Sequence, residues 1–207
     1  MSLRTLSKLA GTSYIVIFAA AVFANFFALE SIIQNPLNAV QHEQLIIRLG
    51  IMAFLLTVAF DVVVAWALYK LYETHPLGAL SSLFRMMHAV IMGVATFALP
   101  MVLNLTTTEA ILKQINIFNT IWLIGLFFFG IHLILLAKIL SKPRFITVFL
   151  AIAGAMYMID TTAHFTMDDY DKFRIAFLTF VAVPSILGEM SLSVWLLAKG
   201  GKAKPNP

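Results

Sequence analysis

The sequence predicts an all-α membrane protein, a bundle of six transmembrane helices with both termini on the cytoplasmic side. Three observations lead to this prediction. First, 61% of the 207 residues are hydrophobic and only 12% are charged, with a mean hydropathy of +0.93, whereas soluble domains are about 45–50% apolar and about 25% charged. Second, six separate runs are long and apolar enough to cross a bilayer. Third, Lys and Arg gather at one end of these runs.

Each run meets the length that a membrane imposes. The hydrocarbon core is about 30 Å thick and a helix rises about 1.5 Å per residue, so a spanning helix needs roughly 20 mostly apolar residues. The predicted helices cover residues 14–33, 45–71, 80–105, 115–140, 145–165 and 175–197. Barrel strands would alternate in hydrophobicity over about ten residues, whereas these runs are apolar on every side.

Turn-forming and polar residues separate the runs. In chain order the breaks are Gln34-Asn35-Pro36, His75-Pro76-Leu77-Gly78, Thr106-Thr107-Thr108-Glu109, Ser141-Lys142-Pro143 and Met167-Asp168-Asp169-Tyr170-Asp171. Because these connections are short, consecutive helices should be antiparallel neighbours in a single domain over residues 1–207. We expect residues 200–207 to form a mobile polar tail. The first run is too long for a signal peptide, so we expect it to be retained.

The distribution of Lys and Arg predicts the orientation, because loops rich in these residues stay in the cytoplasm. One end of the runs collects Arg4, Lys8, Lys70, Arg85, Lys138, Lys142, Arg144, Lys199, Lys202 and Lys204, and the other end collects Arg48, Lys113, Lys172 and Arg174. This bias places both termini inside.

Composition also argues against several classes of protein. The chain has no Cys, which excludes disulfides, thiolate metal ligands and a cysteine nucleophile. No basic stripe with interleaved aromatic residues is present, so nucleic-acid binding has no support. The phosphate-binding and dinucleotide-binding glycine motifs are also missing, which disfavours an ATP-driven pump.

Four ionisable residues fall inside the predicted helices at a similar depth. Asp61, His88, His132 and Glu189 come from four different helices and lie roughly 12–15 Å from the cytoplasmic ends, at 1.5 Å per residue. A charge in hydrocarbon costs about 2.5–3.5 kcal/mol on insertion scales, so such residues face the bundle interior, pair with one another or serve a function. This inner layer is the predicted ligand or proton site.

A second layer lies closer to the opposite face. It contains Glu30, Arg48, Asp160 and His164, of which Asp160 and His164 are four residues apart and share a helix face. Glu30 and Arg48 are also explained by long side chains that reach the interface.

The inner layer leaves three interpretations open. The protein handles a proton, an ion or a small ligand, with Glu189 and His132 at the centre and Asp61 and His88 as partners. Alternatively, the same four residues bind a metal, or His88 and His132 bind haem, in an intramembrane enzyme or redox protein. Finally, the polar layer only holds the helices of a structural or accessory subunit together.

Two prolines lie within the predicted helices. Pro100 and Pro184 each remove one backbone hydrogen bond. Pro184 lies five residues before Glu189, and Gly188 directly precedes Glu189. A kink there could open a wet pocket around Glu189.

Seven short segments, taken in chain order, form a recognisable pattern. They are Arg4 with Gly11-Thr12-Ser13-Tyr14, Arg48-Leu49-Gly50, Leu68-Tyr69-Lys70-Leu71, Gly130-Ile131-His132-Leu133, Gly154-Ala155-Met156-Tyr157-Met158-Ile159-Asp160, Gly188-Glu189-Met190-Ser191 and Trp195-Leu196-Leu197-Ala198-Lys199-Gly200. Together they resemble the DUF4386 family of uncharacterised six-helix bacterial membrane proteins. The resemblance covers nearly the whole chain and implies six helices in a bacterial inner (plasma) membrane. It implies no activity and no cofactor.

Overall fold

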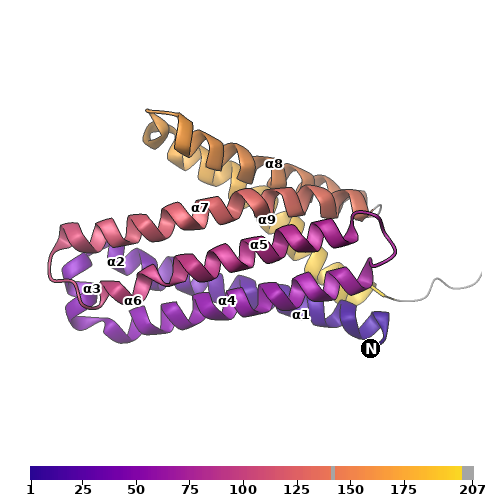
Figure 1. The fold of residues 1–207 in the computed structure, drawn as a ribbon, viewed down its shortest axis with the longest axis horizontal. Coiled ribbons are helices and arrows are strands. Elements are labelled where there is room, and N and C mark those ends of the chain that lie inside the picture. Colours follow the sequence, from indigo (N-terminus) through magenta and orange to yellow (C-terminus); the bar gives the residue numbers. More distant parts are fainter. Residues whose placement is uncertain (141–142, 202–207) are drawn as a thin grey trace, which may run out of the picture.

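The computed structural model describes residues 1–140 and 143–201, and these residues form helices joined by short loops (Figure 1). No strand occurs in these two ranges. The predicted tail from residue 202 onward, and Lys142 among the cationic residues, lie outside the described residues. The all-α prediction is therefore confirmed for the part of the chain that the structure describes.

In the described part of the chain, six helices, some of them interrupted, are long and apolar enough to cross a membrane. The first comprises α1 (Leu3–Phe23), the π-helical turn η1 (Ala24–Leu29) and α2 (Glu30–Gln34), and the third comprises α5 (Gly78–Thr96) and α6 (Ala98–Val102). The others are α4 (Gln44–Leu71), α7 (Thr108–Ile139), α8 (Arg144–Thr166) and α9 (Tyr170–Ala198), and a short helix α3 (Pro36–His42) precedes α4. All six predicted runs are present, and most extend beyond the predicted bounds.

Pro100 and Pro184 differ in their effect on the helices that contain them. The helix that contains Pro100 is interrupted at Phe97, between α5 and α6, because a proline has no N–H for the carbonyl of the residue four positions earlier, here Thr96. Helix α9 continues through Pro184.

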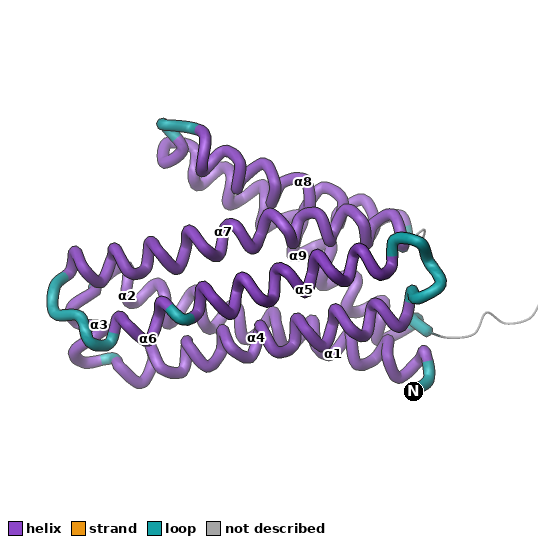
Figure 2. The backbone as a smooth tube through the Cα atoms, in the orientation of Figure 1, coloured by secondary structure: helices purple, strands orange, loops and turns teal. Residues whose placement is uncertain are grey.

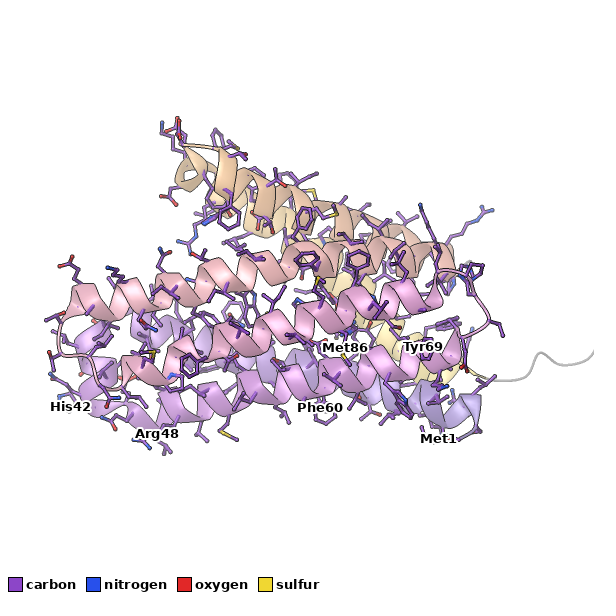
Figure 3. All side chains as sticks on the ribbon, in the orientation of Figure 1. Met1, His42, Arg48, Phe60, Tyr69 and Met86 are labelled. Carbon is purple, nitrogen blue, oxygen red and sulfur yellow. The ribbon has the colours of Figure 1, made fainter. Side chains whose placement is uncertain are left out.

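The six long helices form a closed ring. Each one packs against its neighbours in the order α1, α4, α5, α7, α8, α9, and α9 returns to α1. The loops gather at two opposite ends of the ring (Figure 2). Met1 and Tyr69 lie at one end and His42 and Arg48 at the other (Figure 3). We call these the terminal end and the distal end, because the described part of the chain both begins and finishes at the first.

Two separate apolar cores fill the ring. The terminal-end core draws on all the long helices except α5 and includes Tyr14, Leu68, Phe129, Leu133, Leu150 and Leu192. The distal-end core includes Ile32, Phe54, Leu99, Ile111 and Phe118, and none of its members comes from α8 or α9. At the distal end α8 and α9 accordingly diverge from α7 (Figure 1).

Glycines allow the closest helix contacts. A Cβ atom on Gly130 of α7 would lie 2.5 Å from the carbonyl oxygen of Gly154 on α8, and the reverse distance is also 2.5 Å. Gly11 of α1 faces Leu197 of α9 in the same way. Small residues at such crossings bring backbones together where the surrounding lipid provides no hydrophobic driving force.

Candidate functional site

A cavity of about 180 Å³ lies inside the ring and is lined by all six long helices. Its polar and aromatic lining includes Tyr14 of α1, Asp61 of α4, Arg85 and His88 of α5, Trp122 and Phe129 of α7, Tyr157 of α8, and Ser185 and Glu189 of α9. The rest of the lining is largely aliphatic. The cavity thus combines ionisable groups with apolar walls in the interior of a bundle of membrane-spanning length.

Arg85 is the centre of the polar cluster and is only 1% exposed. Its Nη2 donates to Asp61 Oδ1 at 2.5 Å, and its Nη1 donates to the Tyr14 hydroxyl at 2.8 Å. The guanidinium also lies over the rings of Tyr14 and Phe129, with its carbon 4.7 Å and 5.2 Å from the ring centroids. The positive charge of Arg85 is therefore compensated by one carboxylate and two aromatic faces.

His132 supports Arg85 from α7 and is completely buried. Arg85 Nη1 lies 3.3 Å from His132 Nε2, and His132 Nδ1 lies 2.9 Å from the carbonyl oxygen of Ser81. An arginine only donates, so Nε2 accepts, and the ring proton sits on Nδ1 and is donated to that carbonyl. Both ring nitrogens are thus engaged within the protein, and His132 does not line the cavity.

His88 lines the cavity beside Asp61. Its Nε2 lies 3.7 Å from Asp61 Oδ2, and its ring packs against Phe129 with centroids 4.7 Å apart. Within the described residues, His88 Nδ1 has no hydrogen-bond partner. His88 is therefore held next to the Asp61–Arg85 pair with one ring nitrogen uncommitted to the protein.

Glu189 stands on the α9 wall of the same cavity and is half-buried. Its Oε1 accepts a hydrogen bond of 2.7 Å from Ser185, whose hydroxyl also lies 2.8 Å from that of Tyr157. The preceding residue, Gly188, packs against Leu150 of α8, where a Cβ would lie 3.1 Å from the Leu150 nitrogen. This close contact limits the rotation of α9, and with it the direction of Glu189. Among the described residues Glu189 forms no ion pair.

The predicted inner layer therefore divides into a cluster and a separate carboxylate. Asp61, His88 and His132 meet around Arg85, and Glu189 shares a cavity with this cluster without an ion pair to it. Across residues 1–140 and 143–201, no group of three His, Asp or Glu side chains converges in a way that could hold a metal ion.

The predicted second layer does not form one site. Asp160 is buried and accepts a hydrogen bond of 2.7 Å from the Tyr170 hydroxyl, and His164 packs edge-on against the Tyr170 ring at 4.7 Å. Glu30 and Arg48 are exposed, and each bonds a glutamine one turn away on its own helix, Gln34 and Gln44 respectively. Asp160 and His164 thus connect α8 to the start of α9, while Glu30 and Arg48 lie on the surface.

Arg85 is the main site residue that the predicted inner layer does not include. The bias of Lys and Arg counted it with the cationic residues at the cytoplasmic end, and the structure shows that it is buried at the centre of the cluster. A signal for its true position exists in the helical spacing. Arg85 precedes the buried His88 by three residues and follows the buried Ser81 by four, so the three side chains share one face of α5.

Comparison with known proteins identifies a family. The family model described as "Domain of unknown function (DUF4386)" matches residues 9–200. An uncharacterized protein of Archaeoglobus fulgidus is 30% identical over 159 residues, which cover 74% of this chain and 85% of that protein. No solved structure matches the chain. These similarities supply no activity, so the chemistry of the cavity is the basis for a functional assignment.

Proposed function

Because the chain belongs to the DUF4386 family, whose description names no function, we propose a function from the geometry of the cavity. The protein is a non-enzymatic, multi-pass membrane protein that binds a proton or a small cation at Glu189. The observation that carries this proposal is a carboxylate on the wall of an interior cavity. Within residues 1–140 and 143–201, its only hydrogen bond comes from a hydroxyl group, Ser185 Oγ.

The charges around the cavity favour a positive occupant. Asp61 and Arg85 form a direct ion pair and cancel each other's charge, while His132 is neutral in its hydrogen-bonded form. With His88 neutral as well, an ionised Glu189 leaves the cavity with one net negative charge. In surroundings of low polarity such a charge is costly unless a proton or another cation neutralises it.

The groups around the cavity have distinct roles in this proposal. Glu189 is the binding group, and Ser185 and Tyr157 orient its carboxylate. The charged and titratable groups that share the cavity with it are Asp61, Arg85, His88, Tyr14 and Tyr157. His132 acts as a positioning residue, because its contacts are with Arg85 and Ser81 and it does not line the cavity.

Modification by a hydrophobic carbodiimide tests the proposal. Dicyclohexylcarbodiimide dissolves in lipid and reacts with protonated carboxyl groups. In purified protein in lipid nanodiscs, mass spectrometry should locate the adduct at Glu189, with labelling that falls along a single titration curve as the pH rises. Asp61 should stay unmodified, because Arg85 engages its carboxylate in a buried ion pair.

Glu189→Gln is the matched variant. Glutamine keeps the size of the side chain and an oxygen that accepts from Ser185, so the variant should lose the adduct and retain the thermal stability of the wild type. A large loss of stability would instead support the structural role. Absence of any pH-dependent labelling at Glu189 would contradict proton or cation binding.

The orientation and the membrane also belong to this proposal. By sequence, nine residues remain in the larger group of Lys and Arg, the one predicted to be cytoplasmic, once the buried Arg85 is set aside, against four in the smaller group. The positive-inside rule then places both termini in the cytoplasm. We assign the whole chain to one domain in the inner (plasma) membrane, with the lipid bilayer as its surroundings.

A further inference from the structure

The cavity has a side opening between α1 and α9. Two of its lining residues are also exposed on the outside of the bundle, Phe18 of α1 at 38% and Ile186 of α9 at 47%. Ala21, one turn from Phe18, is half-buried and lines the cavity as well. Residues that belong to both the lining and the outer surface mark the place where the cavity meets the outside.

Helices α1 and α9 are fastened to each other near the terminal end. Ser193 Oγ donates to the carbonyl of Gly11 at 2.8 Å, and Arg4 and Ser7 donate to the carbonyl of Leu196 at 3.1 Å and 2.9 Å. Toward the distal end α9 is exposed, with Phe180 at 61% and Val183 at 51%. The opening therefore lies where α9 departs from α1.

This opening faces the hydrocarbon of a membrane rather than water. Phe18, Ile186, Phe180 and Val183 are all apolar, and both helices are long and apolar enough to span a bilayer. A ligand that enters between α1 and α9 must therefore first dissolve in the lipid. Free inorganic ions do not meet that condition.

The walls of the cavity also select against a bare metal cation. Hard cations such as Mg²⁺ and Ca²⁺ need about six to eight oxygen ligands at close distance, whereas most lining side chains are aliphatic or aromatic. The cavity that Glu189 lines also has aromatic rings in its wall, those of Phe18, Trp122 and Tyr157. Aromatic faces with one carboxylate are the surroundings that bind organic ammonium groups.

The geometry points to a lipophilic organic cation as the occupant: a small ammonium headgroup beside Glu189, with its apolar chain leaving the cavity between α1 and α9. This inference rests on the proposed function, because it names the class of cation that Glu189 binds. A cavity of about 180 Å³ holds a headgroup and not a long chain, so the chain must lie along Phe18 and Ile186 toward the lipid.

Calorimetric titration of the full chain in lipid nanodiscs tests this inference with three cations. Decyltrimethylammonium should bind at least about tenfold more tightly than tetramethylammonium, a difference of about 1.4 kcal/mol, and Na⁺ should not bind. Empty nanodiscs provide the correction for partition into lipid. Glu189→Gln should weaken the binding of decyltrimethylammonium by at least about tenfold.

A matched pair of variants tests the side opening. Ile186→Trp should obstruct it and weaken the binding of decyltrimethylammonium by about tenfold. Leu187→Trp should leave binding unchanged, because Leu187 is exposed to a similar degree, 40%, and is not among the lining residues. The control also shows that a tryptophan at this depth of α9 does not disturb folding.

The outcomes separate this inference from the proposed function. Binding of Na⁺ at Glu189 without binding of decyltrimethylammonium would overturn the inference and leave the proposed function standing. Equal binding of decyltrimethylammonium to wild type and Glu189→Gln, or equal effects of the two tryptophan variants, would overturn the inference as well. Absence of both cation binding and carbodiimide labelling would overturn both.

Discussion

Arg85 is held by groups from three other helices, Tyr14, Asp61 and His132. Removing one member of a buried ion pair strands the other charge, which typically costs about 3–5 kcal/mol, whereas replacing both members with apolar groups is often neutral. The Asp61–Arg85 pair therefore contributes little net stability, although the loss of either member alone is costly.

This reasoning predicts that Asp61→Asn destabilises the protein by about 3–5 kcal/mol, as measured by denaturant or thermal unfolding in detergent. The double variant Asp61→Leu with Arg85→Met should recover most of that loss. If the double variant were as unstable as the single one, the pair would be contributing more than mutual charge compensation.

For single residues, the sequence predicts the depth of a side chain in the membrane better than the direction in which that side chain points. Counting residues from the helix ends places Asp61, His88, His132 and Glu189 in one layer, but depth says nothing about the rotation of each helix. In the structure, Glu189 stands apart from the other three, and His132 contacts Arg85 and Ser81 without lining the cavity itself. Rotation depends on packing between helices, for example that of Gly188 against Leu150, and single-sequence patterns do not specify such contacts.

At the scale of the helices, the crossing of α7 and α8 depends on two glycines. A Cβ on Gly130 would lie 2.5 Å from the carbonyl oxygen of Gly154 and 2.8 Å from Met158 Cγ. Backbone atoms cannot move away as a flexible side chain can, so Gly130→Ala should force the helices apart and cost about 1–3 kcal/mol of unfolding free energy.

Gly93→Ala is the matched control, because its Cβ would meet only Val58 Cγ1, at an ordinary 3.8 Å. This variant should unfold at the same denaturant concentration as the wild type. Equal destabilisation by the two substitutions would mean that loss of glycine itself, and not the α7–α8 contact, is responsible.

The helices themselves could be predicted closely from the sequence, because length and apolarity are imposed by the membrane. The six predicted runs correspond to the six long helices. The interruptions were harder to predict: Pro100 breaks its helix at Phe97, whereas α9 continues through Pro184. The π-helical turn η1 (Ala24–Leu29) contains neither proline nor glycine, so its sequence gives no sign of a helix interruption.

At the scale of the whole molecule, Arg4 connects the start of α1, the first helix of the ring, to the end of α9, the last. Its guanidinium donates to the carbonyl oxygens of Leu196, Leu197 and Gly200 at the end of α9, where a cation also interacts favourably with the helix dipole. Arg4→Ala should lower the unfolding free energy by about 1.5–3 kcal/mol, as expected for a hydrogen bond to a charged group. Lys8→Ala should have little effect, because Lys8 is exposed.

The orientation can be measured directly because the chain has no Cys. Single-cysteine variants at Thr74 and Thr106 place a thiol in exposed loops at the terminal and distal ends, respectively. With both termini in the cytoplasm, a membrane-impermeant maleimide should label Thr106→Cys in intact cells and Thr74→Cys only after lysis. The reverse pattern would contradict the proposed orientation.

The ring arrangement has a consequence for how the protein is made. The ribosome synthesises the helices in chain order. Arg85 therefore enters the membrane long before Glu189, which lies in the last helix to be made. Until α9 arrives, the cavity lacks a wall, and the Asp61–Arg85 pair faces lipid on that side. A chain truncated at Met167 should therefore be degraded rapidly in pulse-chase experiments, and residues 167–207 supplied as a separate polypeptide should extend its lifetime. The site would then come into existence only as synthesis ends, and no incomplete chain could bind the ligand.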